Sequence, residues 1–285
     1  MIPVAFDYVR PTTIDEAIAA LIAGGEDAKL IAGGQSLMPV LRLRMAAPSV
    51  LVDCSAIAEM RGVCDADGAI VIGASTTHHE VMNDPLVREH APLVAQVTST
   101  VADPAIRHRG TFGGSLAHAD PAGDLTGAAI ALDMVMLVAG PNGRREIAAR
   151  DFFVDYFTTS LEPGEILVAV RVPKLGAGWG FHYEKFHTTA QAWAIVGVAA
   201  AVQRQNGSIA AARIGLVNMG AGPRRATATE SALAGAAASA EAVTAAADRA
   251  AEGTRPTSDL HATAEYREHL ARVLTKRAVT KAAGI

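Results

Sequence analysis

The stretch TFGGSLAHADPAGDL, residues 111–125, carries the most informative pattern in the chain. It places a pair of glycines between two hydroxyl residues, and Asp124 follows just before an apolar segment. Glycine adopts positive φ without strain and allows a ligand to approach the main chain closely. Successive N–H groups in such a turn form a concavity that suits phosphate. The stretch therefore predicts a phosphate-binding turn at residues 113–114.

A similar glycine pair occurs upstream in the stretch LIAGGQS, residues 30–36. It follows an apolar run at 29–32, ends in serine and leads into the helix-like segment 37–45. A single Gly-Gly pair is typical of many tight turns that bind nothing. Two such pairs with the same surroundings in one chain favour phosphate binding over an ordinary turn.

The two stretches resemble the flavin signatures of the FAD-binding medium subunit of molybdenum hydroxylases, the carbon monoxide dehydrogenase and xanthine dehydrogenase family. The A-G-G-x-S and T-x-G-G-[SN] turns of that family match residues 32–36 and 111–115, and order, spacing and length agree along nearly the whole chain. The resemblance implies an α+β chain with a PCMH/vanillyl-alcohol-oxidase-like FAD-binding domain of two α/β subdomains, followed by an α+β C-terminal domain with a three-stranded antiparallel sheet plus helices. The implied bounds are 1–176 for the first domain, with subdomains 1–55 and 56–176, and 177–285 for the second.

The resemblance also implies which residues contact FAD. They are Ala32, Gly33, Gly34, Gln35, Ser36, Thr111, Gly113, Gly114, Ser115, Asp124, Leu161, Lys185 and Trp193. Lys185 would lie near the isoalloxazine, where a cation tunes the reduced flavin, and the main chain of Leu161 would contact the ring. Asp124 would contact the flavin nucleotide or, alternatively, cap the helix at 125–132. Trp193 would stack near the flavin or, alternatively, belong to the core of a sheet.

Pyrophosphate contacts are expected from backbone N–H groups at residues 33–36 and 113–115 and from nearby hydroxyl groups. Arg107 and Arg109 precede the second glycine pair and would favour an anion, or would be solvated surface charges. Some positions depart from the usual family pattern. These are Gln35, Phe112, Thr189 and Ala192, and they bear on the side where electrons leave and hence on the acceptor.

The implied function is that of a flavoprotein subunit. It would take electrons from [2Fe-2S] clusters of a small iron–sulfur subunit and pass them through non-covalent FAD to an external acceptor. Substrate would be oxidised at the molybdenum cofactor of a large subunit, as in carbon monoxide dehydrogenases or aromatic and N-heterocycle hydroxylases, in a dimer of heterotrimers. Two alternatives remain open: a self-sufficient FAD oxidase of the same fold superfamily, and a non-redox nucleotide-binding module. The sequence shows no G-x-G-x-x-G, P-loop or G-x-S-x-G pattern, and no catalytic residue is predicted in this chain.

Composition narrows the remaining classes. The 25 basic and 29 acidic residues give a net charge of −4, and no basic run favours nucleic acid. The N-terminus lacks the basic start and apolar segment of a signal peptide, so a cytoplasmic location is expected, with the inner face of the membrane reached only through partners or acceptor. Cys54 and Cys64 are too few for an iron–sulfur cluster, which takes about four thiolates, and buried reduced thiols are expected. The spacing of the histidines predicts no metal site.

The secondary structure expected from the pattern completes the prediction. A capping box at Thr13 starts a helix that Gly24-Gly25 ends, and the dipeptide Asn206-Gly207 turns a hairpin. Further expected elements are strands at 29–32, 49–53, 69–75 and 165–172, helices within 77–101 and at 125–132, a hairpin at 134–148, strands at 180–186, 193–205 and 209–218, and helices after 224.

Overall fold

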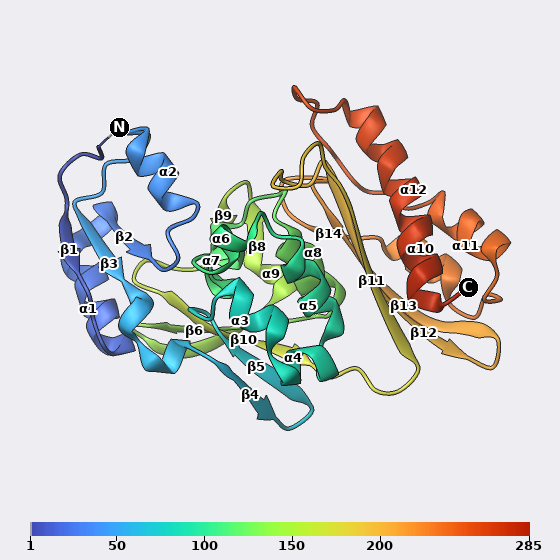
Figure 1. The fold of residues 1–285 in the computed structure, drawn as a ribbon, viewed down its shortest axis with the longest axis horizontal. Coiled ribbons are helices and arrows are strands. Elements are labelled where there is room, and N and C mark those ends of the chain that lie inside the picture. Colours follow the sequence, from blue (N-terminus) through green and yellow to red (C-terminus); the bar gives the residue numbers. More distant parts are fainter. Residues whose placement is uncertain (1) are drawn as a thin grey trace.

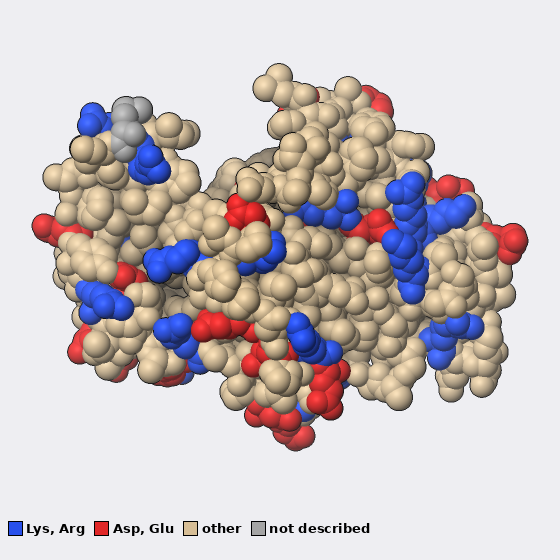
Figure 2. Space-filling model, viewed as in Figure 1, with Lys and Arg blue, Asp and Glu red and all other residues tan. Residues whose placement is uncertain are grey.

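The computed structural model describes residues 2–285 and arranges them as three blocks side by side along the longest axis (Figure 1). The N-terminal block lies at one end, a central antiparallel sheet with short helices follows, and the C-terminal sheet with its helices lies at the other end (Figure 1). On the face drawn in Figure 2 the surface is notched between the N-terminal block and the rest of the molecule.

The N-terminal block is a small parallel sheet of order β1-β3-β2 with one long helix. The helix starts as the sequence predicts, because the Thr13 hydroxyl accepts from the Glu16 N–H at 3.2 Å and the Glu16 carboxylate accepts from the Thr13 N–H at 3.3 Å. It ends at Gly25, which has φ 66°. The elements are β1 (Asp7–Val9), α1 (Ile14–Gly24), η1 (Gly25–Asp27), β2 (Ala28–Ile31), α2 (Leu37–Arg42), β3 (Val50–Asp53), η2 (Cys54–Ala56) and η3 (Ala58–Met60).

The central block is a five-stranded antiparallel sheet of order β4-β5-β10-β6-β7. Its strands are β4 (Val63–Ala66), β5 (Ala69–Gly73), β6 (Val135–Gly140), β7 (Gly143–Ala148) and β10 (Ile166–Pro173), and β8 (Phe153–Asp155) with β9 (Thr158–Thr159) forms a separate pair. Its helices are α3 (His78–Asn83), α4 (Pro85–His90), α5 (Pro92–Ser99), α6 (Pro104–Arg107), α7 (Phe112–His118), α8 (Asp124–Ala131) and α9 (Ala149–Phe152). The predicted hairpin at 134–148 is confirmed, and so are the helices predicted within 77–101. Pro85 and Pro92 divide that region, because each is the first residue of a new helix.

The second glycine pair does not form the predicted turn. Gly113 and Gly114 lie in the first turn of α7, which Thr111 caps through its side chain. Of the four glycines in the two pairs, only Gly34 has positive φ, at 73°. The prediction was wrong here because a hydroxyl residue followed by small residues also begins a helix.

The C-terminal block is an antiparallel sheet of order β11-β12-β13-β14, so a fourth short strand joins the three that were predicted. Its strands are β11 (Trp179–Phe186), β12 (Val196–Gln205), β13 (Ser208–Val217) and β14 (Arg224–Arg225), and its helices are α10 (Thr227–Leu233), α11 (Ala240–Ala247) and α12 (Ala264–Ala283). Asn206 and Gly207 have positive φ in the predicted hairpin turn. β12 begins at Val196, so the strand predicted at Trp193 is in fact loop.

The C-terminal sheet is buried on both faces. Val196, Val198 and Val202 of β12 pack into a core with the C-terminal helices, whereas Ala199 and Ala201 join the core of the first two blocks. The inner face approaches α8 so closely that a Cβ added at Gly215 would lie 2.1 Å from the Gly127 carbonyl oxygen. This contact fixes the inner face of β11, including Tyr183 and Lys185, against the start of α8.

The two cysteines differ from the expectation of two buried thiols. Cys54 is buried, and burial raises the pKa of its thiol to about 12, so it stays protonated. Cys64 is exposed on β4, and that part of the prediction was wrong. Among the helices in residues 2–285, none has the length and apolar character needed to cross a membrane.

Candidate functional site

A cavity of about 740 Å³ lies where the three blocks meet. This volume is within the range of about 300–1,000 Å³ that is usual for ligand pockets. Every cofactor residue predicted from the sequence lines it, namely Ala32, Gly33, Gly34, Gln35, Ser36, Thr111, Gly113, Gly114, Ser115, Asp124, Leu161, Lys185 and Trp193. Residues distant in sequence are therefore gathered at one cavity.

The first glycine turn supplies unsatisfied hydrogen-bond donors to the cavity wall. The backbone N–H groups of residues 33–36 donate to no acceptor within the described chain, residues 2–285. The turn is closed by Gln35, whose side-chain amide donates to the Gly33 carbonyl at 2.9 Å, and by the Met38 N–H, which donates to the Gly34 carbonyl at 2.9 Å. Residues 33–36 are half-buried, and a run of N–H groups without a protein acceptor at a cavity wall forms a concavity that suits an anionic ligand.

The two glycine motifs are in direct contact. A Cβ added at Gly33 would lie 2.1 Å from the Arg109 carbonyl oxygen and 2.7 Å from the Gly110 Cα. Only glycine permits this approach of two main chains. The contact fixes the first turn beside the segment that enters α7.

The backbone of the second motif is already hydrogen-bonded. The N–H of Gly113 donates to the Ala74 carbonyl at 2.9 Å, that of Gly114 to the Thr111 hydroxyl at 3.2 Å, and that of Ser115 to the Thr111 carbonyl at 3.0 Å. The expectation that these N–H groups would be open to a pyrophosphate is therefore wrong. A Cβ at Gly113 would lie 2.3 Å from the Ala74 Cβ, so Gly113 lets α7 pack on the central sheet. Thr111 and Ser115 themselves line the cavity.

Neither of the predicted anion-attracting arginines lines the cavity. Arg109 is exposed, and the Arg107 guanidinium donates to the carbonyl oxygens of Val101 and Ala102 at 2.8 and 3.2 Å. Ala102 has φ 43°, a strained conformation for a residue with a Cβ. Arg107 therefore stabilises a strained segment of the wall.

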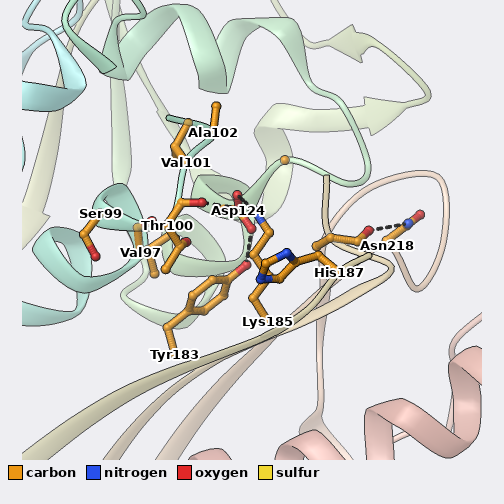
Figure 3. Close-up of polar contacts among 12 residues, drawn as sticks. Val97, Ser99, Thr100, Val101, Ala102, Asp124, Tyr183, Lys185, His187 and Asn218 are labelled. Atoms are coloured by element: carbon orange, nitrogen blue, oxygen red, sulfur yellow. Dashed lines mark hydrogen bonds and ion pairs between the residues drawn. The ribbon is translucent and has the colours of Figure 1, made fainter. Parts of the chain in front are cut away.

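A buried charge pair, Asp124 with Lys185, lies in the cavity wall where α8 meets β11 (Figure 3). Lys185 Nζ lies 2.8 Å from Asp124 Oδ2, and the two side chains are 5% and 4% exposed. Tyr183 donates its hydroxyl to Asp124 Oδ1 at 2.6 Å, and Lys185 also donates to the Thr100 carbonyl at 3.2 Å. Asp124 is the first residue of α8 and Gly123 is the N-cap, so the helix-capping alternative for Asp124 is wrong.

The position of the pair relative to two helices suits its charges. Asp124 lies at the N-terminus of α8, and Lys185 donates to Thr100, which caps the C-terminus of α5. Both placements are favourable for a helix dipole. Burial raises the pKa of the Asp124 carboxyl, an effect that the Lys185 charge and the Tyr183 hydroxyl oppose. Burial, with the adjacent carboxylate, raises the pKa of Tyr183 well above its ordinary value, so the phenol stays protonated.

Trp193 lies in the loop between β11 and β12. It lines the cavity but is 52% exposed, so the alternative of a sheet-core position is wrong. Its ring centroid lies 6.5 Å from that of His118, which also lines the cavity. Gln191 of the same loop donates to Asp103 at 2.6 Å and joins the loop to the opposite wall. Leu161 lies on the wall just before β10.

Sequence reasoning missed two polar residues of the wall, Ser75 and His78. Ser75 Oγ and His78 Nδ1 are buried and have no hydrogen-bond partner within residues 2–285. Burial, with the nearby Arg107 charge, lowers the pKa of His78 to about 4, so its imidazole is neutral. Within the described residues, no three His, Cys, Asp or Glu side chains lie close enough to hold a metal ion. The sequence signal is weak here, because His78 and His79 are adjacent and two neighbouring histidines have no metal-binding spacing.

Two family models account for nearly all of the chain. The model described as "FAD binding domain in molybdopterin dehydrogenase" matches residues 4–175, and the "CO dehydrogenase flavoprotein C-terminal domain" matches residues 181–282. The chain belongs to this flavoprotein family. It is an oxidoreductase component with FAD as its cofactor.

Relatives cover the chain from end to end. The carbon monoxide dehydrogenase medium chain of Hydrogenophaga pseudoflava is 39% identical over 99% of this chain and 98% of its own. The 6-hydroxypseudooxynicotine dehydrogenase complex subunit alpha of Paenarthrobacter nicotinovorans is 36% identical over 99% of this chain and 96% of its own. The solved carbon monoxide dehydrogenase of H. pseudoflava matches with a TM-score of 0.97 at 40% identity, covering 100% of this chain and 99% of that one.

The residues present fit FAD. The open N–H groups of the first turn suit its pyrophosphate, the unpartnered Ser75 Oγ and His78 Nδ1 suit its polar edges, and the apolar remainder of the wall suits a planar ring. No cysteine or histidine lies in either glycine motif, 32–36 or 111–115.

Proposed function

We propose that this chain binds FAD non-covalently in the 740 Å³ cavity, through the residues predicted from the sequence. The observation that carries the proposal is the set of open N–H groups at residues 33–36 in a wall that gathers all of those residues. The first turn would hold the pyrophosphate, with the hydroxyl groups of Ser36, Thr111 and Ser115 as further donors. The roles of Asp124 and Lys185 would be electrostatic, at the ring end of the cavity.

When bound, FAD supplies the electron-transfer chemistry. The proposed role is to pass electrons from the [2Fe-2S] clusters of a small iron–sulfur subunit to an external acceptor, while substrate is oxidised at the molybdenum cofactor of a large subunit. The relatives that carry the name medium chain or medium subunit support this division of labour. A dimer of heterotrimers and a cytoplasmic location stay predictions from the sequence.

The domain division is part of the same proposal. One unit would span residues 1–176, with subdomains 1–55 and 56–176, and the other would span 177–285. Each part has a sheet of its own, which supports these bounds. The cavity would then lie between domains, a common place for cofactors.

The test is direct. Purified chain should show a flavin absorption spectrum, and chain stripped of flavin should recover it on titration with FAD. A chemical reductant should bleach the bound flavin, whereas candidate substrates should bleach it only after the iron–sulfur and molybdenum subunits are added. A chain that takes up no FAD would refute the proposal, and bleaching of the lone chain by an organic substrate would favour a self-sufficient oxidase.

A further inference from the structure

Tyr183 belongs to the same buried cluster as Lys185 and Asp124, yet it does not line the cavity. Tyr183 and Lys185 are two residues apart on β11, so both side chains project from the same face of the sheet. Tyr183 is 7% exposed, and its hydroxyl lies 2.6 Å from Asp124 Oδ1 (Figure 3). Its hydroxyl is therefore placed to act on the cavity through Asp124.

The two oxygens of Asp124 are divided between two donors. Oδ1 accepts from Tyr183 and Oδ2 accepts from Lys185 at 2.8 Å. An ammonium group has three N–H donors, and that of Lys185 uses one on Asp124 and one on the Thr100 carbonyl. The third has no acceptor within residues 2–285, and Lys185 lines the cavity. One donor of a buried cation is thus available to a ligand.

We propose that Tyr183 is a positioning residue that keeps this third N–H of Lys185 directed at the cavity. Its hydroxyl occupies Oδ1 and so limits Lys185 to a single contact with the carboxylate. Without the hydroxyl, Oδ1 is a buried acceptor without a donor, and Lys185 satisfies it by turning onto both carboxylate oxygens. The ammonium then withdraws from the bound flavin. This inference rests on the proposed function.

Gly197 provides the space that the tyrosine hydroxyl needs. It lies opposite Lys185 in the β11–β12 register, and a Cβ added there would lie 2.4 Å from the Tyr183 hydroxyl oxygen. Its next neighbours, the Tyr183 Cζ and the Val217 Cβ, would both be 3.2 Å away. Gly197→Ala therefore displaces the hydroxyl while leaving Tyr183, Asp124 and Lys185 in the sequence. Once the hydroxyl is removed, the same alanine needs only small shifts.

The first measurement is the two-electron midpoint potential of FAD bound to Tyr183→Phe. A cation beside the flavin favours the reduced, anionic form, so its withdrawal lowers the potential. We expect about a fivefold change in the oxidised-to-reduced equilibrium, which is about 20 mV at ~30 mV per tenfold. Tyr8→Phe is the matched control, because Tyr8 also donates its hydroxyl to an aspartate, Asp53, and does not line the cavity. Its potential should equal that of the wild type.

Two further variants separate positioning from simple packing. In the Lys185→Met background, Tyr183→Phe should no longer change the potential, because the effect acts through the ammonium. Gly197→Ala should reproduce the shift of Tyr183→Phe, and adding it to Tyr183→Phe should change the potential no further. Thermal unfolding of the FAD-free variants reports the packing cost separately.

The outcomes are distinct. A chain that binds no FAD would overturn the proposed function and this inference with it. A Tyr183→Phe chain that binds FAD at the wild-type potential would overturn this inference alone, even if the FAD-free chain is less stable. If Tyr183→Phe does not fold, Gly197→Ala takes its place, and a wild-type potential in Gly197→Ala overturns the inference. The inference is also overturned if either variant still shifts the potential when it is combined with Lys185→Met.

Discussion

Removal of Lys185 should destabilise the chain far more than removal of an exposed lysine, even without FAD. At the 2.8 Å separation of Nζ and Oδ2, two unit charges attract by about 6 kcal/mol at an effective dielectric constant near 20. Desolvation of the two groups offsets much of this attraction, but deletion of one partner leaves a buried carboxylate without compensation. Such deletions cost about 3–5 kcal/mol, so Lys185→Met should lose that much free energy of unfolding.

The assay is equilibrium denaturation of the FAD-free chain at pH 7. The matched control is Lys281→Met, because Lys281 also pairs with a carboxylate, Glu184 at 2.6 Å, but is 58% exposed. A surface pair of this kind is worth about 0–1 kcal/mol, so the control should hardly change. Asp124→Asn combined with Lys185→Met should recover most of the loss, since no buried charge then remains. If Lys185→Met loses no more free energy of unfolding than Lys281→Met, the reasoning that Lys185 compensates a buried Asp124 charge is refuted.

Three further predictions concern the cofactor, the packing of the second motif and pH. Acid precipitation should release the yellow FAD into the supernatant, and flavin retained in the pellet would contradict non-covalent binding. Gly113→Ala, whose Cβ would lie 2.3 Å from the Ala74 Cβ, should lower the melting temperature and FAD occupancy, whereas Gly176→Ala, with open space around it, should change neither. Because the pKa of His78 is lowered from 6.5 to about 4, the unfolded chain binds the extra proton first, and stability should fall as pH falls between these values by about 3 kcal/mol. His78→Gln should lose less stability than the wild type between pH 7 and pH 4.5 in urea unfolding.

The sequence predicts helices, strands and turns best where residues close in sequence determine them. The capping box at Thr13 and the turn at Asn206 depend on residues close in sequence, and both are present. The second glycine motif was misread because a local pattern has two outcomes. Thr111 followed by small residues suits a ligand-binding turn and also suits a helix N-terminus. The Gly113 N–H donates to the carbonyl of Ala74, which lies 39 residues earlier in the sequence. This long-range contact favours the helix, and the residues near Gly113 alone do not predict it.

The contacts of Lys185 also depend on residues distant in sequence, which local sequence patterns do not predict. The sequence places Lys185 near the flavin by resemblance, but it cannot show that Asp124, 61 residues earlier, takes half of its hydrogen bonds. That contact needs the C-terminal sheet to lie against α8, which in turn needs the close approach of Gly127 and Gly215. Alternation along β11 indicates that Tyr183 shares a face with Lys185, and this signal was available in the sequence.

The two glycine motifs contribute different features to the same cavity wall. The first motif leaves its N–H groups open and uses the positive φ of Gly34, so it offers directed donors for an anion. The N–H groups of the second motif are already hydrogen-bonded, to Thr111 and to the Ala74 carbonyl, and Gly113 allows close packing, so this motif contributes rigidity and the side chains of Thr111 and Ser115. Gly33 joins them through its contact with the main chain at Arg109. A side chain at Gly33 would therefore push the open N–H groups of the first turn away from the segment that enters α7. A side chain at Gly114 would act differently, because its Cβ would lie 2.6 Å from the Thr111 hydroxyl oxygen. It would displace that hydroxyl, and its effect on the ligand would follow from this displacement.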